Sequence, residues 1–200
     1  GKKVAVGGNL GTPFVALLKQ DPVDYFVLEI STFQLEGIET FRPNIAVILN
    51  ITPDHLDRHK TLEEYSELKG RVSAYQNDGD ILVLNKDDEK VMKQGKRSKA
   101  KKVFFSILEK VDEGAYLEDG SMFTCFDGRK KRVLSVGDLK TTMQFQVENL
   151  LSSMVVATLV NATKSDIANV AMKFESLDHR VEWVRTVRGI DFVNDSKGTN

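Results

Sequence analysis

Five short apolar runs in the first half of the chain restrict the possible fold most strongly. They are rich in Val, Ile, Leu and Phe, do not alternate with polar residues, and lie at residues 3–6, 25–30, 45–50, 81–85 and 103–106. Such runs are typical of strands buried on both faces. Because helical stretches separate them, the pattern predicts an α/β fold in which helices flank a mostly parallel sheet.

The segments between these runs carry helix signals. Thr12 and Pro13 have the residue types of a cap and a first helical position, for a helix that ends near residue 19. Thr61 and Glu64 have capping-box spacing and open a helix predicted to reach residue 76. A weaker, charged helix is predicted over residues 87–97.

From residue 115 to residue 136 the pattern changes to short alternating strands. Asp119-Gly120 and Asp127-Gly128 are typical of two-residue hairpin turns. We therefore expect a small antiparallel appendage to the parallel sheet. Two helices and a last strand pair are predicted beyond it, at residues 147–161, 165–174, 181–187 and 190–193.

The charges of the chain are nearly balanced. There are 28 Lys and Arg residues against 29 Asp and Glu residues, so nothing favours a nucleic-acid or membrane partner. The single cysteine, Cys125, has no partner for an internal disulfide, which suits a reducing compartment. No apolar run of about 18 residues is present to span a bilayer. We expect a cytoplasmic monomer.

Three polar segments follow predicted strands, where a parallel sheet places its ligands. The glycine-rich residues 7–11 can bring backbone amides close to an anion, although a tight turn explains them equally well. Glu29 closes the second run, and a buried carboxylate there needs a cation or hydrogen bonds. It is a magnesium candidate, because hard cations prefer carboxylate oxygen. The alternative is an ordinary pair with Lys or Arg.

The third polar segment covers residues 50–58. Asp54, His55 and Asp57 fall in one turn above the predicted sheet, where their side chains can converge on one ion. A lone histidine in such a place is more often a cap or a surface residue. The helix that follows carries Lys69.

Four segments together resemble the Mur ligases of peptidoglycan synthesis. They are residues 29–36, 50–58, 179–180 and 194–200, and the resemblance spans essentially the whole chain. Within that family, the Ser-Thr-Phe-Gln run after Glu29 and the last six residues are similar to the ligases that add D-glutamate.

The resemblance implies a P-loop-type mononucleotide-binding fold and an ATP-dependent ligase. Residues 1–177 correspond to most of the central ATP-binding domain and residues 178–200 to the start of the C-terminal domain. The implied reaction joins D-glutamate to UDP-N-acetylmuramoyl-L-alanine through an acyl phosphate. Two alternatives stay open, namely another amino-acid ligase of the superfamily and a non-catalytic nucleotide-binding module of the same fold.

The resemblance also assigns residues to the metal and to the substrates. Glu29 and His55 match residues of the magnesium site, and Lys69 matches a lysine that carbon dioxide converts into a carbamate, with two magnesium sites expected in the full-length protein. His55 and Lys69 count as catalytic. The nucleotide and substrate contacts implied are Asn149, Arg180, Asp195 and Lys197 for ATP, Asn9 for the muramoyl substrate, and Thr199 for D-glutamate.

Two features depart from the family pattern. Phe145-Gln146 stands where family members usually have His-Asn, close to Asn149. The phosphate-binding loop Gly-Thr-Asn-Gly-Lys-Ser/Thr does not occur in the 200 residues, and neither does the strand that precedes it. We expect both shortly before Gly1 in a longer protein, and we expect the 200 residues alone to have no ligase activity, because the β and γ phosphates lose their main cradle.

Overall fold

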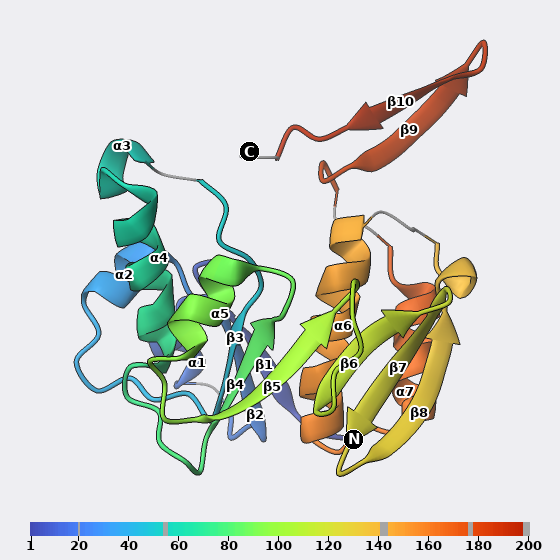
Figure 1. Cartoon of the computed structure of the whole chain (residues 1–200). Helices are drawn as coiled ribbons and strands as arrows, with labels where there is room; N and C mark the ends of the chain where they lie inside the picture. Colours follow the sequence, from blue (N-terminus) through green and yellow to red (C-terminus); the bar gives the residue numbers. More distant parts are fainter. Residues whose placement is uncertain (20, 54–55, 141–143, 176–177, 198–200) are drawn as a thin grey trace.

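A six-stranded sheet forms the largest part of the molecule (Figure 1). The computed structural model describes residues 1–19, 21–53, 56–140, 144–175 and 178–197. Its strands follow the order β3-β4-β5-β6-β7-β8. They are β3 (Ile45–Ile48), β4 (Ile81–Asn85), β5 (Lys101–Ser106), β6 (Gly114–Glu118), β7 (Ser121–Phe126) and β8 (Arg129–Ser135).

The sheet combines the two strand directions that the sequence predicts. β3, β4, β5 and β6 pair in parallel, and β7 and β8 add antiparallel strands. Asp119-Gly120 and Asp127-Gly128 all have positive φ angles, as type I′ hairpin turns require. The α/β fold with a small antiparallel part is therefore confirmed. The antiparallel strands continue the parallel sheet, because β6 is bonded to β5 on one side and to β7 on the other.

β1 (Val4–Gly8) and β2 (Tyr25–Glu29) form a parallel pair of their own. In the described part of the chain no third strand is bonded to this pair. Val6 is 68% exposed and Val27 is 53% exposed. The prediction that these two runs are buried on both faces is therefore wrong for the described residues, because each strand has only the other as a neighbour.

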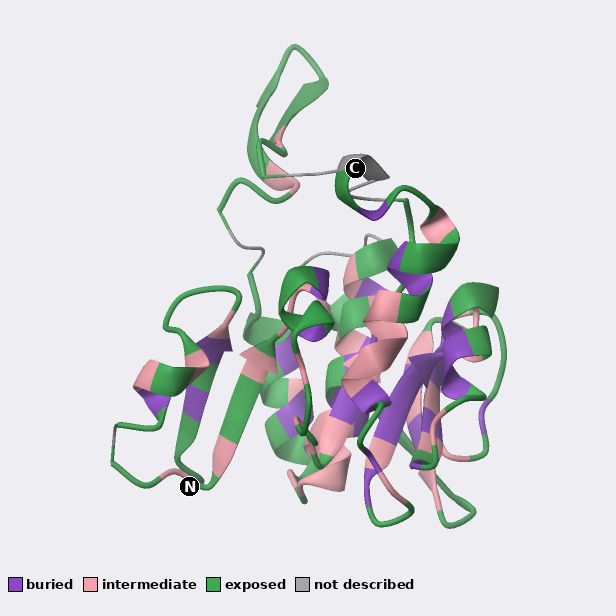
Figure 2. Ribbon diagram, turned by 90° about the vertical axis from the view of Figure 1, so that its left-hand side faces the viewer, coloured by how far each residue is buried: buried purple, intermediate pink, exposed green. Residues whose placement is uncertain are grey.

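Helices cover both faces of the parallel strands. α4 (Leu62–Gly70) and α5 (Glu89–Gly95) pack on one face, and α6 (Gln144–Leu159) packs on the other (Figure 1). The central strand β4 shows the result, because Leu82 and Leu84 join one core and Val83 joins the other. Figure 2 shows these buried stretches in purple. The remaining short elements are α1 (Phe14–Leu17), α2 (Thr32–Glu36), α3 (Leu56–His59), η1 (Arg71–Ser73), η2 (Val136–Asp138) and α7 (Lys164–Lys173).

Two of the predicted helices are shorter in the structure than expected. Pro13, with extended backbone angles, is the residue before α1, and α1 ends at Leu17. α4 ends at Gly70 and continues only as the 3-10 turn η1. A Cβ atom on Gly70 would lie 2.7 Å from the Gln94 side chain, so the glycine serves the close packing of α4 on α5. A Thr163–Asp166 capping box is present at the start of α7.

The end of the chain forms a hairpin of β9 (Glu182–Val187) and β10 (Ile190–Asn194), which confirms the predicted strand pair. It projects beyond the rest of the molecule in Figure 1 and is almost entirely exposed in Figure 2. Trp183, for example, is 61% exposed. Among the described residues the two strands pair only with each other. The domain boundary expected after residue 177 stays a prediction.

An ion pair between a buried carboxylate and a partly exposed arginine, at the start of β4, gives a first testable prediction. The Asp80 side chain is 2% exposed, and the Arg42 guanidinium donates to both of its oxygens, at 2.6 and 3.3 Å. The hydrogen bond from Arg42, followed by the one from the Asn77 backbone N–H, holds the pKa of Asp80 below its ordinary value. We expect Asp80→Asn to lower the free energy of unfolding by about 1–3 kcal/mol at neutral pH.

The effect of Asp80→Asn is expected to depend on pH with a definite sign. A carboxyl group whose pKa is lowered by folding stabilises the protein above its unfolded pKa, and this contribution is lost as the pH falls through the folded pKa. Denaturant titrations of both proteins at about pH 7 and about pH 3 measure this, and the difference between them is expected to shrink at the lower pH. A difference that stays constant contradicts the prediction. Asp112→Asn, at an exposed position, is the control.

Candidate functional site

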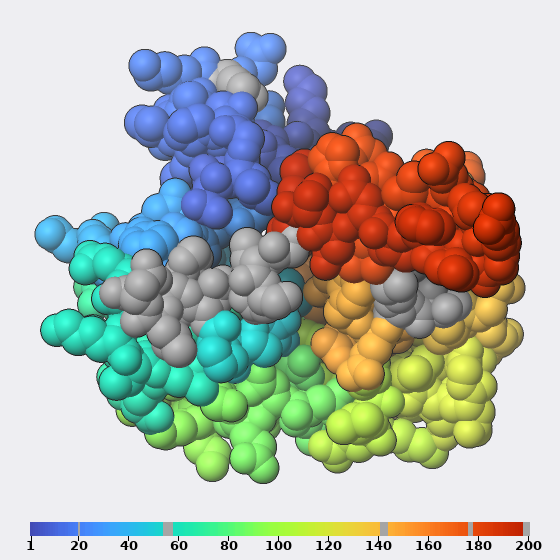
Figure 3. Space-filling model, turned by 90° about the horizontal axis from the view of Figure 1, so that it is seen from above, coloured from blue at the N-terminus to red at the C-terminus, as the bar shows by residue number. Residues whose placement is uncertain are grey.

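Two of the predicted site residues, Asn9 and Glu29, lie at the carboxyl ends of the parallel strands β1 and β2. In Figure 1 the arrowheads of β4 and β5 point toward the side on which α3 and the last hairpin lie. Figure 3 looks onto that side, with the hairpin in red next to the region of α6 in orange. The polar segments after β2 and β3 therefore belong to one edge of the fold.

Glu29 and Asn9 are brought together at the end of β2. The Asn9 side-chain amide donates to Glu29 Oε1 at 3.0 Å, and the Asn9 backbone N–H donates to the Glu29 carbonyl at 2.7 Å. Glu29 is exposed, so the expectation of a buried carboxylate is wrong. The reason is the pairing of β2, which has only β1 beside it in the described chain. The carboxylate keeps an oxygen that accepts no protein hydrogen bond in the described residues and faces solvent.

The glycines at the end of β1 serve a tight turn. Gly8 has a φ angle of +108°, and a Cβ atom there would lie 2.3 Å from the Glu29 carbonyl oxygen. Its backbone N–H donates to the Thr12 carbonyl at 2.9 Å. The amides of Gly8 and Asn9 are thus used within the protein, which favours the turn interpretation of this segment over an anion cradle.

Two side chains fix the backbone that leaves β3. The Asn85 amide donates to the Leu49 carbonyl at 3.0 Å, and the Ile51 N–H donates to Asp88 Oδ2 at 2.8 Å. Asp88 also caps α5 through its other oxygen, which accepts from two backbone N–H groups of the first turn. The end of β4 and the start of α5 therefore hold the first residues of the segment 50–58.

Lys69 reaches the same backbone from α4. Its Nζ donates to the Asn50 carbonyl at 2.9 Å and lies 4.9 Å from the centroid of the Tyr65 ring. The lysine amine is thus held beside the segment that carries the predicted metal ligands. The residue is partly buried.

Several predicted site residues are not described, or only partly described, by the structure. Asp54, His55 and Thr199 lie outside the described residues. Asp57 belongs to α3, but only its backbone is described. The predicted convergence of these side chains on one ion stays a prediction.

His59 is a residue of this region that sequence reasoning missed. It ends α3, is 1% exposed, and lies 2.9 Å through Nε2 from the hydroxyl oxygen of Thr32 at the start of α2. Its ring lies 5.5 Å from the rings of Phe33 and Tyr65, measured between centroids. The sequence offers only one signal for it, its place one helical turn after His55.

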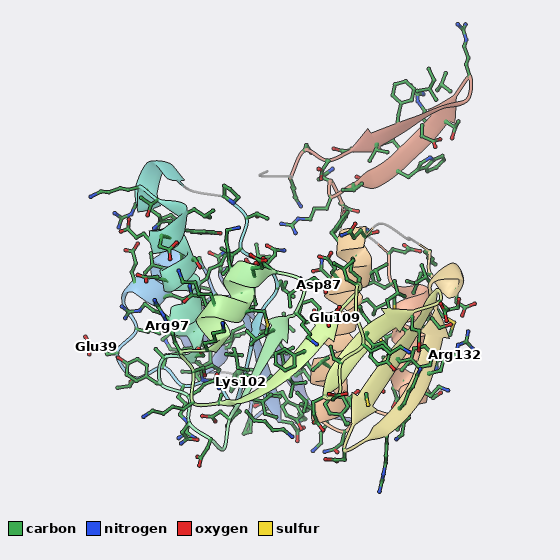
Figure 4. The ribbon with its side chains drawn as sticks, viewed as in Figure 1. Glu39, Asp87, Arg97, Lys102, Glu109 and Arg132 are labelled. Atoms are coloured by element: carbon green, nitrogen blue, oxygen red, sulfur yellow. The ribbon has the colours of Figure 1, made fainter. Side chains whose placement is uncertain are left out.

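A second carboxylate group beyond β4 is fully occupied by protein contacts. Asp87 accepts hydrogen bonds from the Ser106 hydroxyl at 2.5 Å and the Ile107 N–H at 2.7 Å. Glu109, which Figure 4 shows near Asp87, pairs with Lys86 at 3.1 Å. These residues close the turn after β5 and need no ligand.

Three of the predicted ATP contacts come together at the base of the hairpin. The Val181 N–H donates to Asp195 Oδ1 at 3.1 Å, and the Lys197 N–H donates to the His179 carbonyl at 3.0 Å. Arg180 lies between these two contact points in the sequence and is exposed. Arg180 therefore lies next to the backbone segment that carries Asp195 and Lys197, which are 15 and 17 positions further along the sequence.

Asn149 lines a pocket at the start of α6. The pocket has a volume of about 210 Å³ and is lined mostly by apolar side chains, together with Lys140. Gln146, where the family pattern is broken, lines the same pocket one turn before Asn149. Its other walls are Leu139, Leu150, Ser153, Val170, Ala171 and Phe174. A mostly apolar pocket with two side-chain amides suits a flat heteroaromatic ring.

The donor set fits magnesium bound together with a phosphate ligand. Within the described ranges, no three His, Cys, Asp or Glu side chains gather into a metal cluster. Magnesium commonly takes one or two carboxylates from the protein, with waters and substrate phosphates completing its shell. Glu29, exposed and held by Asn9, is a carboxylate of that kind.

Across the described residues, no helix is both long and apolar enough to cross a membrane.

Two variants of Asp88 are expected to distinguish its role as the cap of α5 from its contact with the Ile51 backbone N–H. Asp88→Ser keeps a side-chain oxygen for the cap of α5 but cannot also reach the Ile51 N–H, whereas Asp88→Ala loses both contacts. We expect Asp88→Ala to lower the free energy of unfolding by about 1 kcal/mol and Asp88→Ser to lower it by less. Thermal unfolding of both variants checks this. Equal losses would show that the cap contributes nothing here.

Comparisons with known proteins place these features in one family. Residues 5–157 match the family model described as Mur ligase middle domain. The chain is 39% identical to the UDP-N-acetylmuramoylalanine--D-glutamate ligase of Thermoanaerobacter sp. strain X514 and 42% identical to that of Caldanaerobacter subterraneus subsp. tengcongensis. Each match covers 100% of this chain and 44% of the relative, so the chain spans less than half the length of these relatives.

Solved structures share the fold at lower identity. MurF from Acinetobacter baumannii aligns with a TM-score of 0.73 and 14% identity, over 97% of this chain and 45% of that one. A pseudomurein peptide ligase type C from Methanothermus fervidus aligns with a TM-score of 0.69 and 19% identity, over 98% of this chain and 48% of that one. These likenesses support the arrangement of sheets and helices described above.

Proposed function

The chain belongs to the Mur ligase family, and we propose that the full-length protein joins D-glutamate to UDP-N-acetylmuramoyl-L-alanine with ATP. The observation that carries the proposal is the match of the whole chain to relatives named for that reaction. The geometry supports it, since Asn9 and Glu29 lie at the ends of β1 and β2, and Lys69 reaches from α4 to the backbone that follows β3.

The proposed reaction has two steps. The alanyl carboxylate of the muramoyl substrate attacks the γ-phosphorus of ATP, which gives an acyl phosphate and ADP. The D-glutamate amine then attacks the acyl carbon, the new C–N bond forms, the C–O bond to phosphate breaks, and the amine loses a proton. Such transfers depend on positioning and on charge neutralisation, so the protein need not form a covalent intermediate.

We assign the metal-binding role to Glu29, His55 and Lys69. Magnesium bound there would neutralise the charge of the transferred phosphate. Lys69 contributes an anion only as a carbamate, because an ammonium repels the metal. Its position beside the Asn50 carbonyl and over the Tyr65 ring supports an amine held in place for reaction with carbon dioxide. The carbamate forms when the neutral amine adds to carbon dioxide and releases a proton.

The nucleotide and the other substrates are assigned to the remaining residues. We place the adenine ring in the pocket lined by Asn149, and the ribose or phosphates near Arg180, Asp195 and Lys197. The muramoyl substrate lies near Asn9. Thr199, which is outside the described residues, is assigned to D-glutamate.

The phosphate-binding loop, together with the strand that precedes it, is proposed to belong to a further part of the full-length protein. The exposed apolar residues of β1 and β2 support this, because two parallel strands alone make a poor sheet. The hairpin of β9 and β10, which has no further strand in the described chain, likewise supports a C-terminal domain that begins near residue 178. We also propose a cytoplasmic location and a monomeric state for the full-length protein.

The test is the acceptor profile of the full-length protein. Phosphate release is measured with UDP-N-acetylmuramoyl-L-alanine, ATP, magnesium and one amino acid at a time, and D-glutamate is expected to be the only good acceptor. Another preferred amino acid would indicate a different ligase of the superfamily. ATP binding without turnover for any acceptor would indicate a non-catalytic nucleotide-binding module.

Asn149 offers a separate check of the adenine pocket. Asn149→Ala removes one side-chain amide from the pocket, which is worth about 1 kcal/mol for a typical hydrogen bond. We expect the KM for ATP to rise by about fivefold while the KM for D-glutamate changes little. Steady-state kinetics of the full-length protein measure both constants, with Asn169→Ala, on the exposed side of α7, as the control. An unchanged KM for ATP removes Asn149 from the nucleotide site.

A further inference from the structure

A buried histidine connects the two chain segments that carry the proposed metal ligands. His59 is 1% exposed, and Thr32 is 6% exposed. Their contact, 2.9 Å between Nε2 and the hydroxyl oxygen, joins the end of α3 to the start of α2. These two residues are 27 positions apart in the sequence. Neither belongs to the site assigned above.

The surroundings of His59 favour one direction for this hydrogen bond. Glu36 Oε1 lies 3.7 Å from Nδ1, on the opposite side of the ring from Thr32. A nearby carboxylate favours the proton on Nδ1, which leaves Nε2 to accept from the Thr32 hydroxyl. Glu36 is itself bound by Arg58 at 3.0 Å. The ring is thus oriented from both nitrogens.

Both residues of this contact are close in the sequence to proposed metal ligands. Thr32 follows Glu29 by three residues, and His59 follows His55 by four residues. The His59 ring also lies against Tyr65, whose ring is 4.9 Å from Lys69 Nζ. The His59 side chain therefore contacts Thr32, three residues after Glu29, and Tyr65, which lies beside Lys69, while His59 itself follows His55 by one helical turn. An apolar ring of the same size would fill the space but would not fix α2 against α3, because it has no directional bond to Thr32.

We propose that His59 is a positioning residue for the magnesium site, acting through its hydrogen bond to Thr32. This inference rests on the proposed function, because it takes Glu29 and His55 as the ligands to be aligned. The Thr32–His59 bond sets the separation between the end of β2 and the segment 50–58. Its loss lets the two segments shift relative to each other and weakens metal binding without removing any ligand.

The test compares variants that keep shape but lose the bond. In the full-length protein, His59→Phe keeps a ring between Phe33 and Tyr65, and Thr32→Val keeps the volume of threonine. Thr32→Ser keeps the hydroxyl and is the conservative control. Binding of Mn²⁺, used in place of Mg²⁺, is measured by electron paramagnetic resonance in the presence of ADP, so that the readout does not depend on turnover. Thermal unfolding is recorded for every variant.

The proposal predicts a loss of Mn²⁺ affinity of about tenfold for His59→Phe and for Thr32→Val, as is usual for residues that orient metal ligands. Thr32→Ser is expected to bind Mn²⁺ like the unaltered protein. Thr32→Val decides the question if His59→Phe does not fold, and an unchanged affinity in Thr32→Val overturns the proposal. A full-length protein that binds Mn²⁺ but shows no ligation refutes the proposed function instead.

Discussion

Lys69→Arg is expected to lower the turnover of the full-length ligase by at least about 100-fold, because arginine cannot become a carbamate. The guanidinium keeps the positive charge of the unmodified lysine and repels magnesium. Its length also allows contact with the Asn50 carbonyl, so the fold is expected to persist. Turnover with saturating ATP and D-glutamate measures the effect.

Carbon dioxide provides the second arm of the Lys69 experiment. The unaltered protein is expected to lose turnover after prolonged incubation in buffer freed of carbon dioxide and to regain it when bicarbonate is added. The turnover of Lys69→Arg is expected to stay the same when bicarbonate is added. Lys173→Arg, at an exposed position of α7, is the matched control. Full turnover by Lys69→Arg would rule out the carbamate.

Glu29→Ala is the second change with a large expected effect. The carboxylate is the described side chain best suited to magnesium, and its loss is expected to reduce turnover by at least about 100-fold. Because Glu29 is exposed and bonded through its side chain only to Asn9 in the described chain, we expect little change in the unfolding temperature. Kinetics and thermal unfolding together distinguish a site defect from a folding defect.

Two further variants sharpen the test of Glu29. Glu29→Gln keeps an oxygen and the shape but loses the charge, so it is expected to fall between Glu29→Ala and the unaltered protein at high magnesium. Glu39→Ala removes an exposed carboxylate that Figure 4 shows at the outer side of the molecule, and it is expected to leave turnover unchanged. Normal turnover in Glu29→Ala removes this residue from the metal site.

The strands were the most predictable part of the fold. Residues 81–85 form β4 with the predicted boundaries, because a continuous apolar run in a central strand is buried by helices on both faces. The same pattern misled for β1 and β2. Their composition indicates burial, but burial depends on neighbours, and in the described chain each has only one bonded neighbour.

The site was predictable where strand order alone decides position. Glu29 and the start of the segment 50–58 each lie at the carboxyl end of a parallel strand, as predicted, although β2 and β3 belong to different sheets in the described chain. His59 and Asp88 were missed for the opposite reason. Each acts through one contact to a residue more than 25 positions away, with Thr32 and Ile51 respectively. Such pairs carry no local signal in the sequence.

The backbone of residues 49–51 has a consequence for ligand affinity. Three side chains from three different elements, Asn85, Lys69 and Asp88, each hold one of these consecutive residues. A loop ordered in this way loses its conformational entropy during folding and not during ligand binding. Binding then loses less entropy, and more of the interaction energy remains as affinity. Substitution of Asn85 is therefore expected to make the entropy of ligand binding more unfavourable, which calorimetry measures.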